Sequence, residues 1–153
     1  MRYAINGKEY FAIGFKNDAG GYELRNPYSK LSSSPKDITT IKNNAPKDIV
    51  FEGFMDFLSF VSIHKNEPVS NRDFVVLNSV SFFEKARPFM EQHEVIHLYL
   101  DRVSTGHNYS QYALSLSPKY KHESSLYKHH KNINYWVVNF GKLRHKKQGQ
   151  KLH

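Results

Sequence analysis

Two acidic side chains stand directly after apolar, strand-like segments of the sequence. Glu52 follows the run IVF at residues 49–51, and Asp101 follows VIHLYL at residues 95–100. Ligand sites in parallel sheets form at the carboxyl edge of the strands, so both carboxylates are expected at that edge. Mg²⁺ takes hard oxygen ligands and usually keeps waters and phosphate oxygens in the rest of its shell. The two carboxylates therefore predict a Mg²⁺ site.

Each of these acidic residues also has a simpler explanation. An acidic side chain at a strand end often caps the helix that follows, because it accepts hydrogen bonds from free backbone N–H groups. Asp56, one helical turn after Glu52, either supports the same site or faces solvent. The pairing of Glu52 with Asp101 favours the metal site, and capping stays open for either residue alone.

The elements that must position these residues alternate along the chain. Hydrophobic spacing predicts a helix after each of three short strands. The strands lie at 49–51, 74–77 and 95–100, and the helices begin at Phe54, near 81 and near 104. Parallel strands need such crossover connections. The sequence thus predicts an α/β fold with a parallel sheet flanked by helices, and Asn78 and Ser79 share its carboxyl edge.

The two ends of the chain have a different character. Residues 9–15 and 21–25 flank a turn and predict an N-terminal antiparallel β-hairpin. Further predictions are a surface loop at 26–36, a short strand at 37–41, a strand or loop at 119–127 and a last helix from about 132 to 141. We expect three parts, a β-rich subdomain at 1–47, a core at 48–141 and a basic flexible tail at 142–153.

Composition excludes several classes of protein. The 153 residues carry a formal net charge of +8 and contain no cysteine, which excludes a disulfide framework, a thiolate nucleophile and Cys-ligated zinc. Residues 1–100 hold 12 basic and 12 acidic side chains, so the whole surplus lies in the last third. The chain has no apolar run of about 18 residues and no signal-like N-terminus, so we expect a cytoplasmic protein without a membrane partner.

The segment His93-Glu94-Val95-Ile96-His97 matches the zinc-protease pattern H-E-x-x-H. That chemistry needs both imidazoles on one helix face. Because the pattern runs into the predicted strand at 95–100, the two rings are expected to be separated, which argues against a zinc protease.

Four segments carry motif-like patterns in a fixed order. They are VFEGFMD at 50–56, FVVLNSV at 74–80, LYLDRVSTG at 98–106 and, upstream, the run from Ile13 to Lys36 with Gly14, Gly20, Gly21, Arg25, Ser34 and Pro35. The first and third resemble the two signatures of the Toprim fold, an apolar-Glu-Gly-x-x-Asp segment and a strand ending in Asp-x-Asp-x-x-Gly. The whole resembles the bacterial-type DNA primases and the mobilisation primases of mobile elements. The resemblance therefore implies a Toprim-like parallel sheet preceded by an antiparallel hairpin region.

The resemblance also implies roles for single residues. Glu52 would act in acid–base chemistry and metal binding, Asp101 would bind Mg²⁺, and Asp56 would support the site. Arg25 and Lys36 correspond to basic residues that contact nucleic acid or nucleotide phosphates, and Arg102 lies near them in the family's arrangement. DNA or RNA is the implied partner, with nucleotides as further ligands.

The sequence departs from the family's pattern at two acidic positions. Val103 stands where the family has its second aspartate, and Asn132 stands where related primases favour aspartate. Fewer carboxylates hold divalent ions less strongly, so we expect one Mg²⁺ ion or none. The chain also lacks the cysteine-bearing zinc ribbon with which primases capture template, which implies a separated fragment or a stand-alone remnant.

The basic C-terminal third favours a nucleic-acid partner, because each neutralised phosphate releases counterions. Lys142, Arg144, Lys146, Lys147 and Lys151 lie there, and a tail that only improves solubility is the alternative. Two functions stay open. One is Mg²⁺-dependent phosphoryl transfer in primer synthesis, and the other is a catalytically degenerate nucleic-acid-binding module. A third, docking to an acidic protein, rests on the tail alone.

Overall fold

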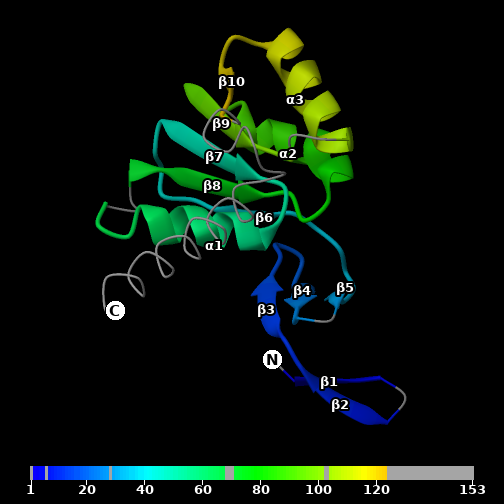
Figure 1. Ribbon diagram of the computed structural model, residues 1–153. Helices are drawn as coiled ribbons and strands as arrows, with labels where there is room; N and C mark the ends of the chain where they lie inside the picture. The colour runs from blue at the N-terminus through cyan, green and yellow to red at the C-terminus, as the bar shows by residue number, and fades with distance from the viewer. Residues whose placement is uncertain (1, 6, 28, 68–70, 102–103, 124–153) are drawn as a thin grey trace, which may run out of the picture.

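The computed structural model describes residues 2–5, 7–27, 29–67, 71–101 and 104–123 (Figure 1). In chain order the elements are β1 (Arg2–Ile5), β2 (Lys8–Phe11), β3 (Ile13–Lys16), β4 (Tyr22–Arg25), β5 (Lys30–Ser32), β6 (Thr39–Ile41), β7 (Lys47–Phe51), α1 (Phe54–Ile63), β8 (Asp73–Val76), the 3₁₀ helix η2 (Val80–Phe82), α2 (Phe83–Met90), β9 (Val95–Tyr99), α3 (Ser104–Leu116) and β10 (Tyr120–His122). Within these ranges no helix is long and apolar enough to cross a bilayer. The predicted helix at 132–141 and the basic tail lie outside the described residues.

The larger sheet has five strands in the order β10-β9-β7-β8-β6. β10, β9, β7 and β8 run parallel, and β6 pairs with β8 antiparallel at the edge. This confirms the predicted α/β class with its helical crossovers. The segment at 119–127 contains the strand β10, which the sequence left open, and the short strand predicted at 37–41 forms the antiparallel edge.

Alternate residues of the central strands bury two separate cores. On one face, Ile49, Phe51, Phe74 and Val76 pack against Phe54, Phe57 and Phe60 of α1. On the other face, Val50, Val75, Ile96 and Leu98 pack against α2 and α3 through Phe83, Ala86, Met90 and Ala113. The continuous apolar strands that the sequence shows are therefore those of a sheet covered on both faces. Among the described helices, α1 covers one face and α2 and α3 cover the other.

The N-terminal strands form a second layer beside this sheet. β3, β4 and β5 make an antiparallel sheet, which confirms the predicted hairpin, and β1 pairs with β2 in a separate ribbon. The sequence segment 9–15 is two strands, β2 and β3, that are broken at Ala12. The prediction of a loop throughout 26–36 is wrong at residues 30–32, because β5 adds to β4 there.

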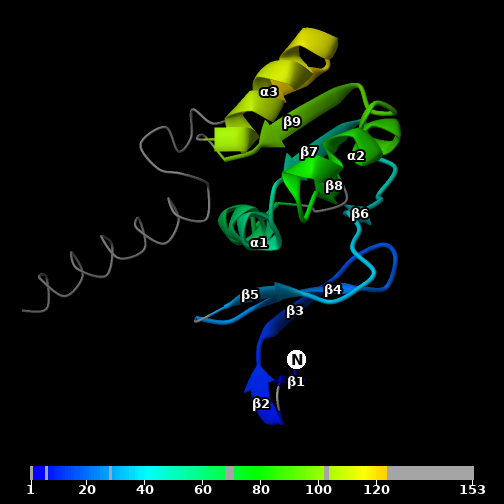
Figure 2. The ribbon, with the colours of Figure 1, turned by 90° about the vertical axis from the view of Figure 1, so that its right-hand side faces the viewer.

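Asn17 lies at the joint between the smaller sheet and the segment that leads to the larger one. Its buried side chain accepts hydrogen bonds from the backbone N–H groups of Ala19 and Gly21, both at 2.9 Å, and donates to the carbonyl of Pro35 at 2.8 Å. A Cβ on Gly21 would lie 1.9 Å from the Pro35 carbonyl oxygen, so this approach requires glycine. Figure 2 shows β3–β5 lying below α1 and the larger sheet as a result.

Three more hydrogen bonds cross the same joint. The carboxylate of Asp18 accepts from the backbone N–H and the hydroxyl of Thr40, both at 2.9 Å, and the Thr39 hydroxyl donates to the Lys16 carbonyl at 2.9 Å. Thr39 and Thr40 belong to β6, so the smaller sheet is tied to an edge strand of the larger one. This connection fixes how β4 and β5 face the carboxyl edge.

The opposite edge of the larger sheet contains a buried cluster of titratable groups. His93 lies just before β9, with Nε2 at 2.6 Å from Asp73 Oδ2 and Nδ1 at 3.9 Å from Asp48 Oδ2. Asp48 is fully buried, and neither of its carboxyl oxygens has a hydrogen-bond partner among the described residues. Asp73 also accepts from the backbone N–H groups of Asn43 and Ala45.

Burial and neighbouring charges shift the pKa values of Asp48 and Asp73 in opposite directions. Loss of hydration raises the pKa of Asp48 to about 8, with the charge of Asp73 adding to the rise and that of His93 opposing it. Burial also acts to raise the pKa of Asp73, but hydrogen bonds from His93 and from backbone N–H groups lower it overall. The cluster therefore holds a protonated Asp48 beside an ionised Asp73 at neutral pH.

Asp48→Asn should change how stability depends on pH. Native Asp48 keeps its proton up to a pKa of about 8, whereas an unfolded chain releases it near pH 4. Between these values unfolding releases a proton, so rising pH destabilises the wild type. As the pH rises, the free energy of unfolding of the variant minus that of the wild type, measured with urea, should increase by up to ~1.4 kcal/mol per pH unit. Glu94→Gln, at an exposed neighbouring position, is the control, and parallel curves for Asp48→Asn and wild type would contradict the prediction.

Candidate functional site

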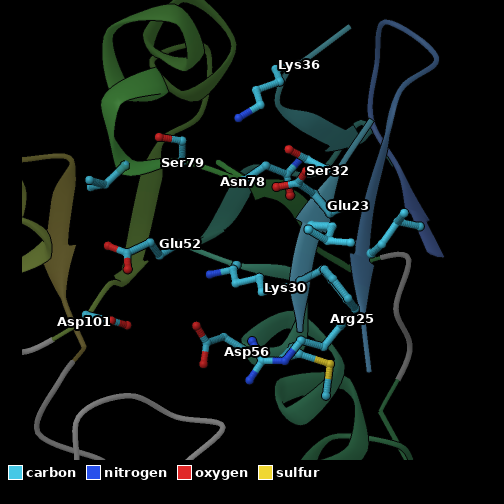
Figure 3. Close-up of a pocket in the computed structure, with 16 residues that line it drawn as sticks. Glu23, Arg25, Lys30, Ser32, Lys36, Glu52, Asp56, Asn78, Ser79 and Asp101 are labelled. Carbon is cyan, nitrogen blue, oxygen red and sulfur yellow. The ribbon is translucent and has the colours of Figure 1, made fainter. Parts of the chain in front are cut away.

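Three polar residues lie together at the carboxyl edge of the larger sheet. β7 lies between β9 and β8, with Phe51 opposite both Tyr99 and Val76. Glu52 follows β7, Asp101 follows β9 by two residues, and Asn78 follows β8. Asp56 sits in the first turn of α1 and is buried. In Figure 3 the carboxylates of Glu52, Asp56 and Asp101 point into one common space. Glu52 and Asp101 thus lie at the edge that their strand-end positions predicted.

The structure decides against helix capping by Glu52. Gly53 occupies the N-cap position of α1, and no side chain forms a capping hydrogen bond there. Oε1 of Glu52 is buried and has no hydrogen-bond partner within the described part of the chain. Burying a carboxylate oxygen without a partner is unfavourable, so this atom is suited to a ligand that the protein alone does not supply.

The electrostatics of the site favour a cation. The pKa of Glu52 is raised to about 7. Burial is the largest cause, the negative charge of Asp101, a hydrogen bond with Asp101 and the charge of Asp56 add to it, and Lys30 opposes it. A bound cation would relieve this repulsion. In the described ranges no three His, Asp or Glu side chains are grouped as a ready metal site. Among the described residues, Glu52 and Asp101 alone are those that could hold one Mg²⁺, with waters or phosphate oxygens in the rest of its shell.

Gly106, in the first turn of α3, allows this arrangement. A Cβ at that position would lie 2.8 Å from Glu52 Oε1, 2.8 Å from the Asp101 carbonyl oxygen and 3.0 Å from its backbone nitrogen. Two of these three neighbours are backbone atoms, which cannot move aside as a flexible side chain does. The glycine of the Asp-x-x-x-x-Gly segment is therefore needed where the helix start, the Asp101 backbone and Glu52 meet.

A wall of basic residues faces the carboxylates across a cleft of about 530 Å³. Arg25 lies at the end of β4, Lys30 at the start of β5, and Lys36 in the loop before β6. Lys30 and Arg25 extend toward Glu52 and Asp56, and Lys36 extends toward Ser79 (Figure 3). The cleft thus has an acidic wall from the larger sheet and a basic wall from the smaller one.

Two of these basic residues lie directly opposite each other. Arg25 and Lys30 are partners in the β4–β5 register, so their side chains share one face of the sheet. Like charges in this position repel and destabilise the strand pair. Glu23, two residues before Arg25, lies on the same face, and its pKa is raised because burial outweighs the attraction of Lys36 and Lys30. An anionic ligand in the cleft would relieve the repulsion between Arg25 and Lys30.

The structure brings together five of the residues that the sequence predicted for the site. Glu52, Asp56, Asp101, Arg25 and Lys36 all line the cleft. Arg102 and Val103 lie outside the described residues, as do Asn132, Lys142, Arg144, Lys146 and Lys147. Their roles stay predictions.

Sequence reasoning missed Lys30 and Glu23 and gave Asn78 no role. Lys30 was assigned to a loop, and only its pairing with Arg25 across β4–β5 places it in the cleft. Asn78 adopts a positive φ of 64°, and its Nδ2 donates to the Asp37 carbonyl at 2.9 Å and to the Thr39 hydroxyl at 3.1 Å. Asn78 thereby holds the segment that follows Lys36.

The histidines of the H-E-x-x-H match are separated, as predicted. His93 is buried in the cluster with Asp73, whereas His97 lies in β9 and its Nδ1 is 2.7 Å from Glu123 Oε1. They do not share a helix, so the protease pattern has no structural basis.

Comparison with protein families identifies the core. A family model described as Toprim-like matches residues 49–137, more than half of the chain. The chain belongs to the Toprim-like family. A second model, described as a domain of unknown function (DUF8464), matches residues 1–34, which include β1–β5. None of the curated proteins with which the sequence was compared matches it.

Solved structures share the fold of both parts of this Toprim-like chain. The crystal structure of the primase fragment of the bacteriophage T7 primase-helicase protein matches with a TM-score of 0.64 and 17% identity, over 96% of this chain and 64% of that one. A structure of the T7 lagging-strand DNA polymerase interacting with primase domains of two gp4 subunits matches with a TM-score of 0.53 and 18% identity, over 86% and 79% of the two chains. Our chain thus spans slightly less than two thirds of the first of these. The matches confirm the predicted fold, with the N-terminal sheet preceding a Toprim core as in primases.

Gly106→Ala should disturb the site, whereas Gly53→Ala should not. A Cβ at Gly106 meets the Asp101 backbone and Glu52, so the variant should lower the free energy of unfolding by about 1–3 kcal/mol, the range for overpacking. A Cβ at Gly53 would meet no described atom within 4 Å, and the cost there should stay below about 1 kcal/mol. Urea unfolding measures both, and equal stability of the two variants would argue against the close approach at Gly106.

Proposed function

We propose that this chain is a primase-like nucleic-acid domain that binds phosphates between the carboxyl edge of its Toprim sheet and the basic strands β4 and β5. The observation that carries this proposal is the cleft, in which Glu52, Asp56 and Asp101 face Arg25, Lys30 and Lys36. A phosphate chain with a divalent cation satisfies both walls together, because the cation neutralises the acidic wall and the phosphates neutralise the basic wall. The fold shared with a T7 primase fragment supports the same assignment.

Each wall has a distinct part in the proposed activity, phosphoryl transfer during primer synthesis. Glu52 and Asp101 would hold Mg²⁺, which supplies charge neutralisation at phosphate oxygens when it is bound. Arg25 can bind phosphate oxygens with two parallel hydrogen bonds, and Lys30 acts as a single positive charge. Glu52 would also take part in proton transfer, and Asp56 would support this role because its negative charge helps to raise the pKa of Glu52.

Mg²⁺ should stabilise the protein through these two carboxylates. A ligand that binds only the folded state at ten times its Kd adds about 1.4 kcal/mol to the free energy of unfolding, so wild-type protein should melt at a higher temperature with Mg²⁺ or Mn²⁺. Glu52→Gln and Asp101→Asn should each remove most of this shift, because each removes a ligand charge. Asp48→Asn, which removes a buried carboxyl group at the other edge of the sheet, should keep the stabilisation by the metal. A wild-type melting temperature that neither Mg²⁺ nor Mn²⁺ changes would contradict the proposed ion site.

The second candidate is a nucleic-acid-binding module without catalysis. The replacement of the family's second aspartate by Val103 favours it, since a weaker metal site leaves binding intact and impairs transfer. EDTA distinguishes the two functions. Binding of single-stranded DNA or RNA that survives EDTA, with no primer synthesis in Mg²⁺ or Mn²⁺, supports the module, whereas metal-dependent synthesis that Glu52→Gln abolishes supports the enzyme.

Phosphate binding by the basic wall should appear in the salt dependence of affinity. Arg25→Ala and Lys30→Ala should each weaken binding of single-stranded DNA and reduce the slope of log affinity against log salt by about 0.7, the value for one phosphate contact. Lys65→Ala is the control, because Lys65 is exposed just beyond α1, whose ten residues span about 15 Å away from the cleft. Fluorescence anisotropy at several salt concentrations measures the slopes. Slopes unchanged in both basic-wall variants would rule out phosphate contacts at β4 and β5.

A further inference from the structure

A second, apolar hollow of about 490 Å³ lies next to the cleft. Its lining includes Phe11, Ile13, Pro27 and Met55, together with Arg25 and Asn26. Phe11 and Ile13 are 66% and 53% exposed, the two highest values among the large apolar side chains that the structure describes. We call Phe11, Ile13, Pro27 and Met55 the apolar shelf.

The shelf continues a row of side chains that is anchored in the core. Ile13 and Phe15 alternate along β3, so their side chains are directed to the same side of that strand. Phe11, at the end of β2, lines the same hollow as Ile13. Phe15 stacks on Phe54 of α1 with ring centres 5.2 Å apart and an angle of 9° between the rings. Ile13, the next residue on that side, lies opposite Arg25 in the β3–β4 register. The row thus leads outward from the packed core to the exposed ring of Phe11.

Arg25 and Met55 line both the shelf and the cleft. A ligand whose phosphate binds to Arg25 would therefore place the group attached to that phosphate on the apolar side. The shelf is held in shape by two contacts: the guanidinium of Arg2 lies 5.3 Å from the centre of the Phe11 ring, and Asn26 Nδ2 donates to the Phe11 carbonyl at 3.3 Å. The apolar shelf beside Arg25 therefore suits a ligand in which a flat apolar group lies next to a phosphate.

We propose that an unpaired nucleobase of a single-stranded nucleic acid stacks on the apolar shelf, next to the phosphate that Arg25 binds. Every base has a π-face that can stack on an aromatic ring beside a positively charged backbone path, and such binding tolerates any sequence. The arginine over the Phe11 ring adds a cation–π contact that keeps the ring in place. This inference rests on the proposed function, because the strand must enter through the phosphate-binding cleft.

The test compares a short oligothymidylate with an abasic strand of the same length and charge. Fluorescence anisotropy gives the affinity of wild-type protein for each strand, and their ratio measures the contribution of the bases. One stacked base contributes about 5- to 150-fold in affinity. Phe11→Ala should remove most of this ratio, and Phe11→Trp should restore it. The control is Tyr112→Ala, which removes a 41% exposed aromatic ring from α3, outside both hollows.

The outcomes separate the shelf from the proposed function. The shelf is supported if Phe11→Ala loses the base preference while its salt dependence is unchanged. Phe11→Trp and Tyr112→Ala should both retain the base preference. Equal wild-type affinity for both strands, or a base preference that survives in Phe11→Ala, overturns the shelf and leaves phosphate binding in the cleft intact. If neither strand binds the wild-type protein, the shelf and the proposed phosphate binding are both overturned. A change of association state by sedimentation in Phe11→Ala, without any change in base preference, shows that a second copy covers the shelf and overturns the proposal.

Discussion

The pairing of β7 with β9 on one side and β8 on the other is the constraint on which the rest of the structure depends. Parallel strands in register end at the same edge, so Glu52, Asp101 and Asn78 become neighbours although the chain separates them by up to 49 residues. The two apolar faces of these strands then require helices on both sides. α1 starts at this edge as a consequence, and its first turn adds Asp56 to the site.

The two edges of the sheet contain buried acids in different circumstances. At the amino edge, Asp73 ionises beside His93 and three donors satisfy it, while Asp48 keeps its proton because burial raises its pKa. At the carboxyl edge, Glu52 has one buried oxygen without a described partner and repulsive acidic neighbours. At the amino edge the protein itself supplies the partners of the ionised Asp73, whereas at the carboxyl edge the repulsion around Glu52 favours a bound cation.

The joint at Asn17 and Asp18 gives the site its second wall. Hydrogen bonds from these side chains hold the β3–β5 sheet to Pro35 and to β6, which itself pairs with β8. The basic face of β4 and β5 is therefore connected, through backbone structure, to the same sheet that carries the carboxylates. Phe15 adds a second connection by stacking on Phe54. The repulsion between Arg25 and Lys30 is maintained by this framework.

The sequence alone determined the fold class, the order of strands and helices in the core, and that Glu52 and Asp101 lie at one edge of the sheet with Asp56 one helical turn away. It could do so because hydrophobic periodicity and strand-end position are local properties of the chain, and because the Toprim-like segments occur in a fixed order. Arg25 and Lys36 came from resemblance alone. β5 was missed because its three residues are all exposed and polar signals around them indicate a loop.

Only the tertiary structure decided which residues face one another across the cleft. Lys30 became part of the site through its register with Arg25, Gly106 through a close approach of α3 to Glu52, and the apolar shelf through the meeting of β2, β3 and α1. These relations depend on long-range pairing and on packing distances of a few ångströms, which no local pattern encodes. For the same reason the burial that raises the pKa values of Glu52 and Asp48 could not be predicted from residue types.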